Sequence, residues 1–412
     1  MSTPNHPGDA FRVREVAWLE LFPWLRLTRT LGVAMKARLL VLASAGLLLT
    51  LFGWWILGWA FKSNEDVRPL VAAYQSCVWN GDASGVSGWV IPHDDAAGPH
   101  LAHWPALPFR DLWWKFSAPL RQFFSSSTTF VGGVFLLLCT LWALAVWGLF
   151  GGAIARSAAL AIGREQNASV GESIRFAVSK WGSYIAAPLM PLIGALLVGV
   201  PLMIAGWIMR TDLGAAALGG MWPVMLLGGL LITVFLLGLF FGWPLLFASI
   251  STEATDSFDA VSRTYSYVQQ RPWQYLWYAL VATALSWAGA LLADNFATAV
   301  IHFTHWMVSV GSGQARIAEL TAGRGGELFA AQAIWFWNGV VRVVALGFLV
   351  SHFWVAATAI YLLLRHDTDG AELDEVFVDQ AGESFGLPPV EVDAQGVTIV
   401  AKSETVIVDE PA

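Results

Sequence analysis

The sequence predicts an all-α membrane protein that crosses the bilayer six times. Its apolar residues fall in six blocks of roughly 20 or more, the length that spans a hydrocarbon core of about 30 Å. Charged residues make up 13% of the chain, about half of the usual ~25%, and the mean hydropathy is +0.59. Many of the 23 tryptophans flank the apolar blocks, where aromatic rings anchor helices at the membrane interface.

The domain plan follows from where these blocks lie. We expect a membrane domain over residues 39–366, between an N-terminal segment at 1–38 and an acidic tail at 367–412. The spans are expected at 39–61, 129–154, 185–209, 224–250, 273–293 and 335–364, with one long loop at 62–127. Prolines at 188, 191 and 201 predict that the third span is kinked or broken. The helix of the fifth span can continue along the surface to Val310.

Amphipathic stretches are expected to lie at the membrane interface. Residues 11–37 mix basic and aromatic side chains, which suits a helix on an anionic leaflet or one packed on its own membrane domain. Pro23 should break that helix in two. The second part of the long loop carries apolar residues at helical spacing from Phe109 to Phe124, so we expect it to return to the bilayer surface.

Two segments repeat one plan, in which a span is followed by a capped surface helix and another span. Ser169 and Glu172 have the spacing of a capping box. In the second segment an apolar face, formed by Phe258, Val261, Tyr265 and Val268, should meet the interface or the neighbouring spans. Asp259 and Arg263 on the same helix are expected to face the cytoplasm as a pair.

Small residues in the spans predict close contacts between helices. Gly148 and Gly152 are four apart, as are Gly238 and Gly242. Such spacing allows two helices to approach closely in a membrane. We expect these contacts to lie within one subunit, and a dimer seam is the alternative.

The distribution of charge indicates the orientation. Lys and Arg gather at one set of span ends, at Arg26, Arg29, Lys36, Arg38, Arg156, Arg164, Arg175, Lys180, Arg263, Arg271 and Arg365. Basic residues favour the cytoplasmic side, so both termini are expected in the cytoplasm. The tail carries a net charge of −11 and the rest of the chain +4, which argues against nucleic-acid binding.

Histidines are the candidate metal ligands. His93, His100 and His103 lie in the long loop near two aspartates, and imidazole with carboxylate suits Zn²⁺ or Mn²⁺. Their spacing matches no closed metal site, so we expect a solvated loop, with a metal as the alternative. His302 and His305 share a helical face, and we interpret them as interfacial histidines rather than metal ligands.

Three ionisable residues within the spans are candidates for intramembrane polar contacts. Asp294 and Arg342 should both lie near the outer boundary of the hydrocarbon core, by the rise of about 1.5 Å per residue. They would either pair or reach water separately. His352 should lie near the midplane, where it would take part in a proton path or stay neutral and bonded to a neighbouring helix.

Several stretches resemble a family of bacterial integral membrane proteins that is best represented in planctomycetes. The similar stretches lie within residues 20–378 and are Leu141–Arg156, Ser257–Val268, Gln270–Pro272, Ile360–Arg365 and Asp369–Val376. The resemblance implies a bacterial cytoplasmic (inner) membrane. It implies no activity, ligand or catalytic residue.

We therefore expect a structural or interaction protein of the membrane that needs no cofactor. Its partners would be membrane lipids and, for the acidic tail, a protein. We expect no catalytic role, because catalysis usually needs clustered ionisable groups and the predicted spans contain almost none. The alternative is a transporter or channel for a neutral or lipid-like solute, whose path the proline-containing third span would line.

The predicted orientation can be tested with single cysteines in a chain that lacks Cys77 and Cys139. An impermeant thiol reagent added to intact cells should label Gly98→Cys, because the long loop lies outside. It should not label Asn167→Cys or Ser403→Cys until the membrane is opened. Labelling of Asn167→Cys in intact cells would reverse the predicted topology.

Overall fold

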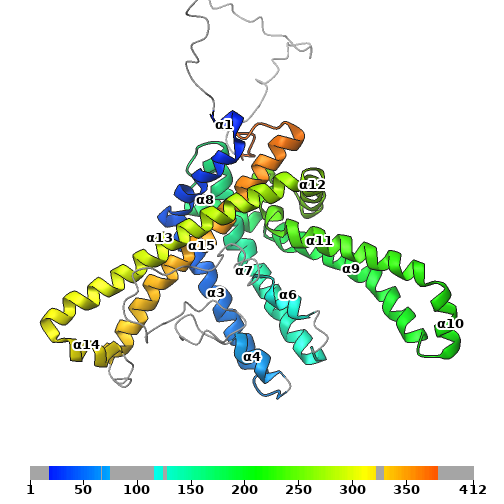
Figure 1. Cartoon of the computed structure of the whole chain (residues 1–412), viewed down its shortest axis with the longest axis horizontal. Coiled ribbons are helices and arrows are strands. Elements are labelled where there is room, and N and C mark those ends of the chain that lie inside the picture. The colour runs from blue at the N-terminus through cyan, green and yellow to red at the C-terminus, as the bar shows by residue number, and fades with distance from the viewer. Residues whose placement is uncertain (1–17, 66, 75–115, 124–127, 322–328, 379–412) are drawn as a thin grey trace, which may run out of the picture. The chain divides into compact units, whose positions relative to one another are not determined.

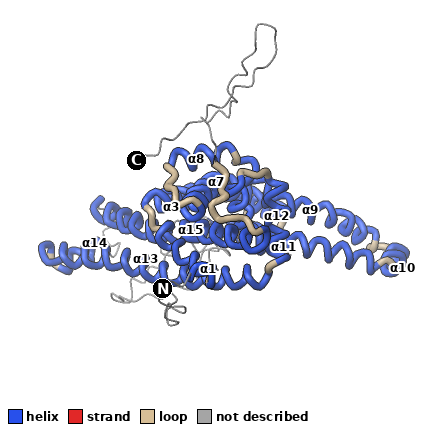
Figure 2. Tube along the Cα trace, turned by 90° about the horizontal axis from the view of Figure 1, so that it is seen from above, coloured by secondary structure: helices blue, strands red, loops and turns tan. Residues whose placement is uncertain are grey.

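The computed structural model describes residues 18–65, 67–74, 116–123, 128–321 and 329–378. Every regular element within these ranges is a helix, as Figure 2 shows. The chain divides into two compact units, Met1–Val376 and Phe377–Ala412. All of the described helices belong to the first unit.

Six of the described helices are long and apolar enough to cross a membrane (Figure 1). They are α3 (Ala37–Phe61), α7 (Phe130–Gly163), α9 (Trp181–Ile208), α11 (Trp222–Glu253), α13 (Pro272–Ser312) and α15 (Phe329–Asp369). The prediction of an all-α, multi-pass membrane protein with six spans is confirmed.

Several helices extend beyond the predicted spans, because a helix ends where its backbone is capped and not where the lipid ends. α7 continues to Gly163 through an alanine-rich stretch, and alanine is the strongest helix former. α13 runs without a break to Ser312. Of the two expectations for the third span, a kink or a break, the break is excluded, since α9 is one helix with its three prolines inside. It lies along α11 for much of its length, and neighbouring helices help a membrane helix to tolerate proline.

Shorter helices precede the first span and occupy the connections between the spans. They are α1 (Trp18–Leu21), the 3₁₀ helix η1 (Pro23–Thr28), α2 (Arg29–Ala34), α4 (Arg68–Tyr74), α6 (Ala118–Phe123), α8 (Val170–Ser179), α10 (Asp212–Gly220), α12 (Ser257–Gln270) and α14 (Gln314–Thr321).

The described part of the N-terminal segment packs on the membrane domain. Pro23 starts a new helix, as predicted. Ser351 on α15 donates a hydrogen bond to the carbonyl oxygen of Ala34. The basic side chains bind the α7–α8 connection: Arg29 pairs with Glu165 at 2.9 Å and Lys36 donates to Asn167 at 2.7 Å. Of the two alternatives for this segment, the contacts favour packing on its own chain.

The most buried residues gather at one end of the first unit, where α3 and α13 begin and where α7, α11 and α15 end. We call this the closed end and the opposite end the open end. At the closed end, most residues of 350–365 on α15 are 0–3% exposed. Toward the open end α9 and α11 leave the other spans. In the most apolar 18-residue stretch of each helix, only 17% of the residues of α9 and 6% of those of α11 are buried, against 78% for α15. The core therefore lies at one end of the bundle.

The surface helices α8 and α12 are capped as predicted. Ser169 and Glu172 form a capping box, and the Asp256 side chain accepts the backbone N–H of Asp259. The buried residues of α12 are Ala260, Thr264 and Tyr267. Of the predicted apolar face, Tyr265 meets α11, where its hydroxyl donates to the carbonyl oxygen of Phe235 at 2.7 Å. Phe258 is 72% exposed within the chain. The small Ala260 and Thr264 allow the backbone of α12 to approach α11, which a face of large side chains would prevent.

Both glycine pairs form contacts within the chain. A Cβ added to Gly152 would lie 2.7 Å from the Tyr184 ring on α9, and one added to Gly238 would overlap the Tyr265 ring on α12. Gly148 likewise lies against Trp181. The first pair thus packs two spans within the chain as predicted, whereas Gly238 and Gly242 pack α11 on the surface helix α12 instead of on a span.

We predict that Gly152→Ala lowers the melting temperature in detergent, because the new methyl group must displace the buried Tyr184 ring. Overpacking of this kind costs about 1–3 kcal/mol. Gly206→Ala on α9 is the matched control, since a Cβ there meets nothing within 4 Å and alanine favours helix. A Gly152→Ala protein that is as stable as the Gly206→Ala protein would contradict the packing of α7 on α9.

Candidate functional site

The closed end is built around the turn that follows α11. Ala254 has the left-handed backbone conformation, at φ +56°, which L-residues rarely adopt. Its carbonyl oxygen accepts a hydrogen bond from Lys180, at the start of α9. Two residues later Asp256 caps α12. This turn reverses the chain, so that the last residue of α11, Glu253, lies beside α12 and α15.

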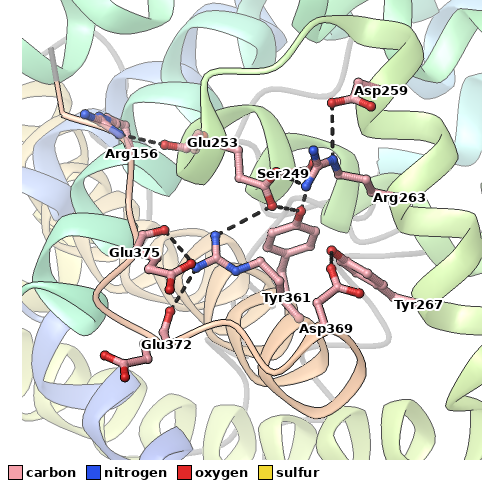
Figure 3. Close-up of polar contacts among 12 residues, drawn as sticks. Arg156, Ser249, Glu253, Asp259, Arg263, Tyr267, Tyr361, Asp369, Glu372 and Glu375 are labelled. Atoms are coloured by element: carbon pink, nitrogen blue, oxygen red, sulfur yellow. Dashed lines mark hydrogen bonds and ion pairs between the residues drawn. The ribbon is translucent and has the colours of Figure 1, made fainter.

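The Glu253 carboxylate lies between two guanidinium groups (Figure 3). Its oxygens are 2.5 Å from Arg263 on α12 and 3.6 Å from Arg365 on α15. The Tyr361 hydroxyl donates to the same carboxylate at 2.6 Å. The side chains of Glu253 and Arg365 are only 11% and 5% exposed. One nearly buried anion thus joins three helices.

Arg263 also pairs with Asp259 at 3.2 Å, which confirms the predicted pair on α12. The prediction that Arg263 simply faces the cytoplasm is incomplete, because its guanidinium turns toward Glu253. Burial alone would lower the pKa of Arg263, but the carboxylates of Glu253 and Asp259 raise it above its ordinary value. Arg263 therefore stays charged and holds α12 to α11.

Arg365 attaches the beginning of the acidic tail. Its second terminal nitrogen donates to the carbonyl oxygens of Glu372 at 2.9 Å and Glu375 at 2.7 Å. Tyr267 on α12 donates to Asp369, which also draws the tail inward (Figure 3). Val376 is 4% exposed. Residues 367–376 thus belong with the membrane domain, beyond the boundary expected at 366.

Arg156 is the centre of a second set of contacts at the closed end. It is 4% exposed and donates to the carbonyl oxygen of Ser251 on α11 at 2.9 Å. Its guanidinium also lies 4.2 Å from the centre of the Phe176 ring on α8, a cation–π contact. Tyr184 on α9 shares a hydrogen bond of 2.7 Å with the Ser251 hydroxyl. Arg156 and Ser251 thereby join α7, α8, α9 and α11.

Sequence reasoning missed this network. Arg156 and Arg365 counted only as markers of orientation, and Glu253 was not singled out. The available signal was that each of these charges directly adjoins an apolar span, at ends predicted to lie on the same side. A charge in that position is either exposed to water or paired with another helix end.

Of the predicted polar residues within the spans, His352 is placed most clearly. It is 0% exposed, with Nε2 3.1 Å from the Thr30 hydroxyl and Nδ1 2.7 Å from the Ser286 hydroxyl. Thr30 donates its proton to the carbonyl oxygen of Leu27, so we infer that it accepts from Nε2–H and that Ser286 donates to Nδ1. This arrangement is that of a neutral ring joining α2, α13 and α15.

The other predicted residues are not brought together. Asp294 and Arg342 are both half-buried, and no ion pair joins these two described side chains. His305 lies 3.2 Å from Asn338. The described residues contain no group of three or more His, Cys, Asp or Glu that could hold a metal. His93, His100 and His103 lie outside the described residues.

A cavity of about 250 Å³ lies between α6, α7, α9 and α11. Its apolar lining includes Leu144, Leu192 and Leu239, and its polar lining residues are Ser117, Arg121 and Thr140. Pro188 of α9 also lines it. The cavity therefore lies where the α9–α11 pair leaves the bundle.

The segment that holds α6 forms one wall of this cavity and differs from the prediction. Phe116 inserts among Trp147, Trp243 and Trp354, with ring centres 5.0–6.1 Å apart. The segment 116–123 thus enters the middle of the bundle instead of staying at the surface. Such re-entrant backbone is tolerated at membrane depth when it is buried in protein.

No family model, curated protein or solved structure matches this chain.

We predict that Glu253→Gln is strongly destabilising, because it leaves the nearly buried Arg365 without its anion. Breaking a buried pair typically costs about 3–5 kcal/mol, and the partial exposure of Arg263 should bring the loss toward the lower value. Asp259→Asn is the matched control and should cost only about 0.3–0.5 kcal/mol, as for an exposed helical pair. Thermal unfolding in detergent checks both. Equal melting temperatures for the two variants would rule out the central role of Glu253.

Proposed function

We propose that this chain is a non-catalytic structural or interaction protein of the bacterial cytoplasmic membrane, with both termini in the cytoplasm. The basic residues near the closed end support this orientation, because the closed end would then face the cytoplasm. The charged groups there pair with one another across helices. Such pairing supports a role in holding the fold, whereas catalytic groups need to face a substrate.

The observation that carries the proposal is the exposure of the α9–α10–α11 hairpin. Leu197 and Met203 on α9 are 70% and 72% exposed, and Leu226 on α11 is 61% exposed. In a bilayer, helices associate through close packing rather than through the hydrophobic effect. Two spans that pack mainly on each other thus offer long faces to a helix of another membrane protein.

The acidic tail offers a second contact. Residues 377–412 follow the segment that Arg365 holds against the closed end. The carboxylates of the tail would favour a basic partner in the cytoplasm.

The alternative function, transport of a lipid-like solute, is favoured by one observation, the apolar cavity beside Pro188. The cavity has the chemistry of a lipid chain rather than that of a polar solute. Reconstituted vesicles containing a fluorescent phospholipid test this alternative. Under our proposal the protein should not speed the exchange of that lipid between leaflets, and a severalfold acceleration would favour transport.

Photo-cross-linking tests the interaction role. A photoreactive amino acid at Leu197 or Leu230 should give protein adducts in the native membrane, because these positions lie on the hairpin. The matched control is Val41 on α3, which is 66% exposed and should give lipid adducts alone. An adduct of twice the chain's mass identifies a second copy, and another mass identifies a different protein. Lipid adducts alone at all three positions would contradict the proposal.

A further inference from the structure

The cavity at the root of the hairpin has the chemistry of a lipid site. Most of its lining is aliphatic or aromatic, contributed by α7, α9 and α11. Phe240 on its rim is 39% exposed, and Leu144 is half-buried. These rim residues belong to transmembrane helices, so the cavity is reached from the bilayer. The apolar molecules available there are acyl chains.

The depth of the cavity follows from α7. Arg156 marks the closed end, and Trp147 and Thr140 lie nine and 16 residues before it on α7. At about 1.5 Å per residue they are roughly 13 and 24 Å from Arg156. A hydrocarbon core is about 30 Å thick. The cavity thus runs from near the midplane almost to the membrane boundary on the side of the open end.

The polar lining residues gather where a lipid headgroup would lie. Arg121 lines the cavity together with Thr140, and Thr140 lies within about 6 Å of that boundary by the same rise per residue along α7. The Arg121 Nε donates to the Ser117 hydroxyl at 3.1 Å, which orients the guanidinium. An arginine is suited to phosphate because its planar group presents several donors.

We propose that this cavity binds one acyl chain of an anionic phospholipid from the leaflet at the open end, with the lipid phosphate at Arg121. The chain extends along α7 toward Trp147, where Phe116 closes the cavity. The site does not rest on the proposed interaction role, because it concerns a lipid that one chain holds by itself.

Native mass spectrometry of the full-length protein tests the site, with phosphatidylglycerol and phosphatidylcholine of identical chains. The wild-type protein should retain one phosphatidylglycerol per chain, about fivefold more often than phosphatidylcholine, a ratio that corresponds to about 1 kcal/mol. Arg121→Gln should remove this preference, whereas Arg210→Gln, outside the cavity, should keep it. A preference that survives Arg121→Gln would overturn the assignment of the headgroup.

Variants that fill the cavity test the position of the chain. Ala143→Phe and Leu192→Trp should each reduce retention of both lipids several-fold, whereas Leu197→Phe, on the exposed face of α9, should not. The two substituted residues differ in burial, since Ala143 is 8% exposed and Leu192 is half-buried. If Ala143→Phe fails to fold, Leu192→Trp still tests the site. Unchanged retention in the folded Leu192→Trp protein would overturn the proposal.

A phospholipid with a photoreactive group near the end of one chain locates the lipid directly. Cross-links should map to the peptides that contain Leu144 and Leu239, and Leu192→Trp should abolish them. Cross-links confined to the peptide around Leu197 would mean that lipid only coats the hairpin, and the cavity site would be wrong.

Discussion

The shared Glu253 carboxylate is the contact on which the arrangement of helices most depends. Glu253 is the last residue of α11, and its carboxylate pairs with Arg263 on α12 and with Arg365 on α15. In a membrane, apolar side chains gain little by leaving lipid for protein, so packing alone does not choose among similar arrangements of helices. A nearly buried anion between two cations does favour one arrangement of the helices, since any arrangement that separates these groups leaves a charge in a medium of low dielectric constant. Arg365 also holds the start of the acidic tail.

This constraint acts at one end only, and the burial of the six spans reflects it. The residues of α15 near Arg365 are almost wholly buried, whereas α9 and α11 become exposed as they leave the closed end. Between these regions the aromatic rings of Phe116, Trp147 and Trp354 fill the centre of the bundle. Beyond them, within the described part of the chain, the two helices of the hairpin pack mainly on each other. Its remaining faces have to be covered by lipid or by another protein.

Local patterns in the sequence predicted the elements, while contacts between distant residues decided how the elements combine. The spans, the break at Pro23 and the caps at Ser169 and Asp256 depend on neighbours within a few residues. The partners of His352 come from residues 322 and 66 positions away, and no periodicity indicates them. The re-entry of Phe116 was missed for a similar reason, because an amphipathic pattern does not distinguish a membrane surface from a groove between helices.

The closed inner wall of the cavity indicates whether the cavity holds a lipid or lets a solute cross the membrane. A solute that crossed the membrane here would have to separate Phe116 from Trp147 and Trp354, which lie 5.0 and 6.1 Å away between ring centres. Each aromatic pair contributes about 0.5–1.5 kcal/mol beyond its buried area, and Trp354 is 0% exposed. Behind these rings lie the paired charges of Glu253 and Arg365, which hold α11 to α15. A chain that enters from the open side therefore meets a wall that is stabilised from behind, and a cavity open to one leaflet is suited to holding a lipid rather than to moving it across.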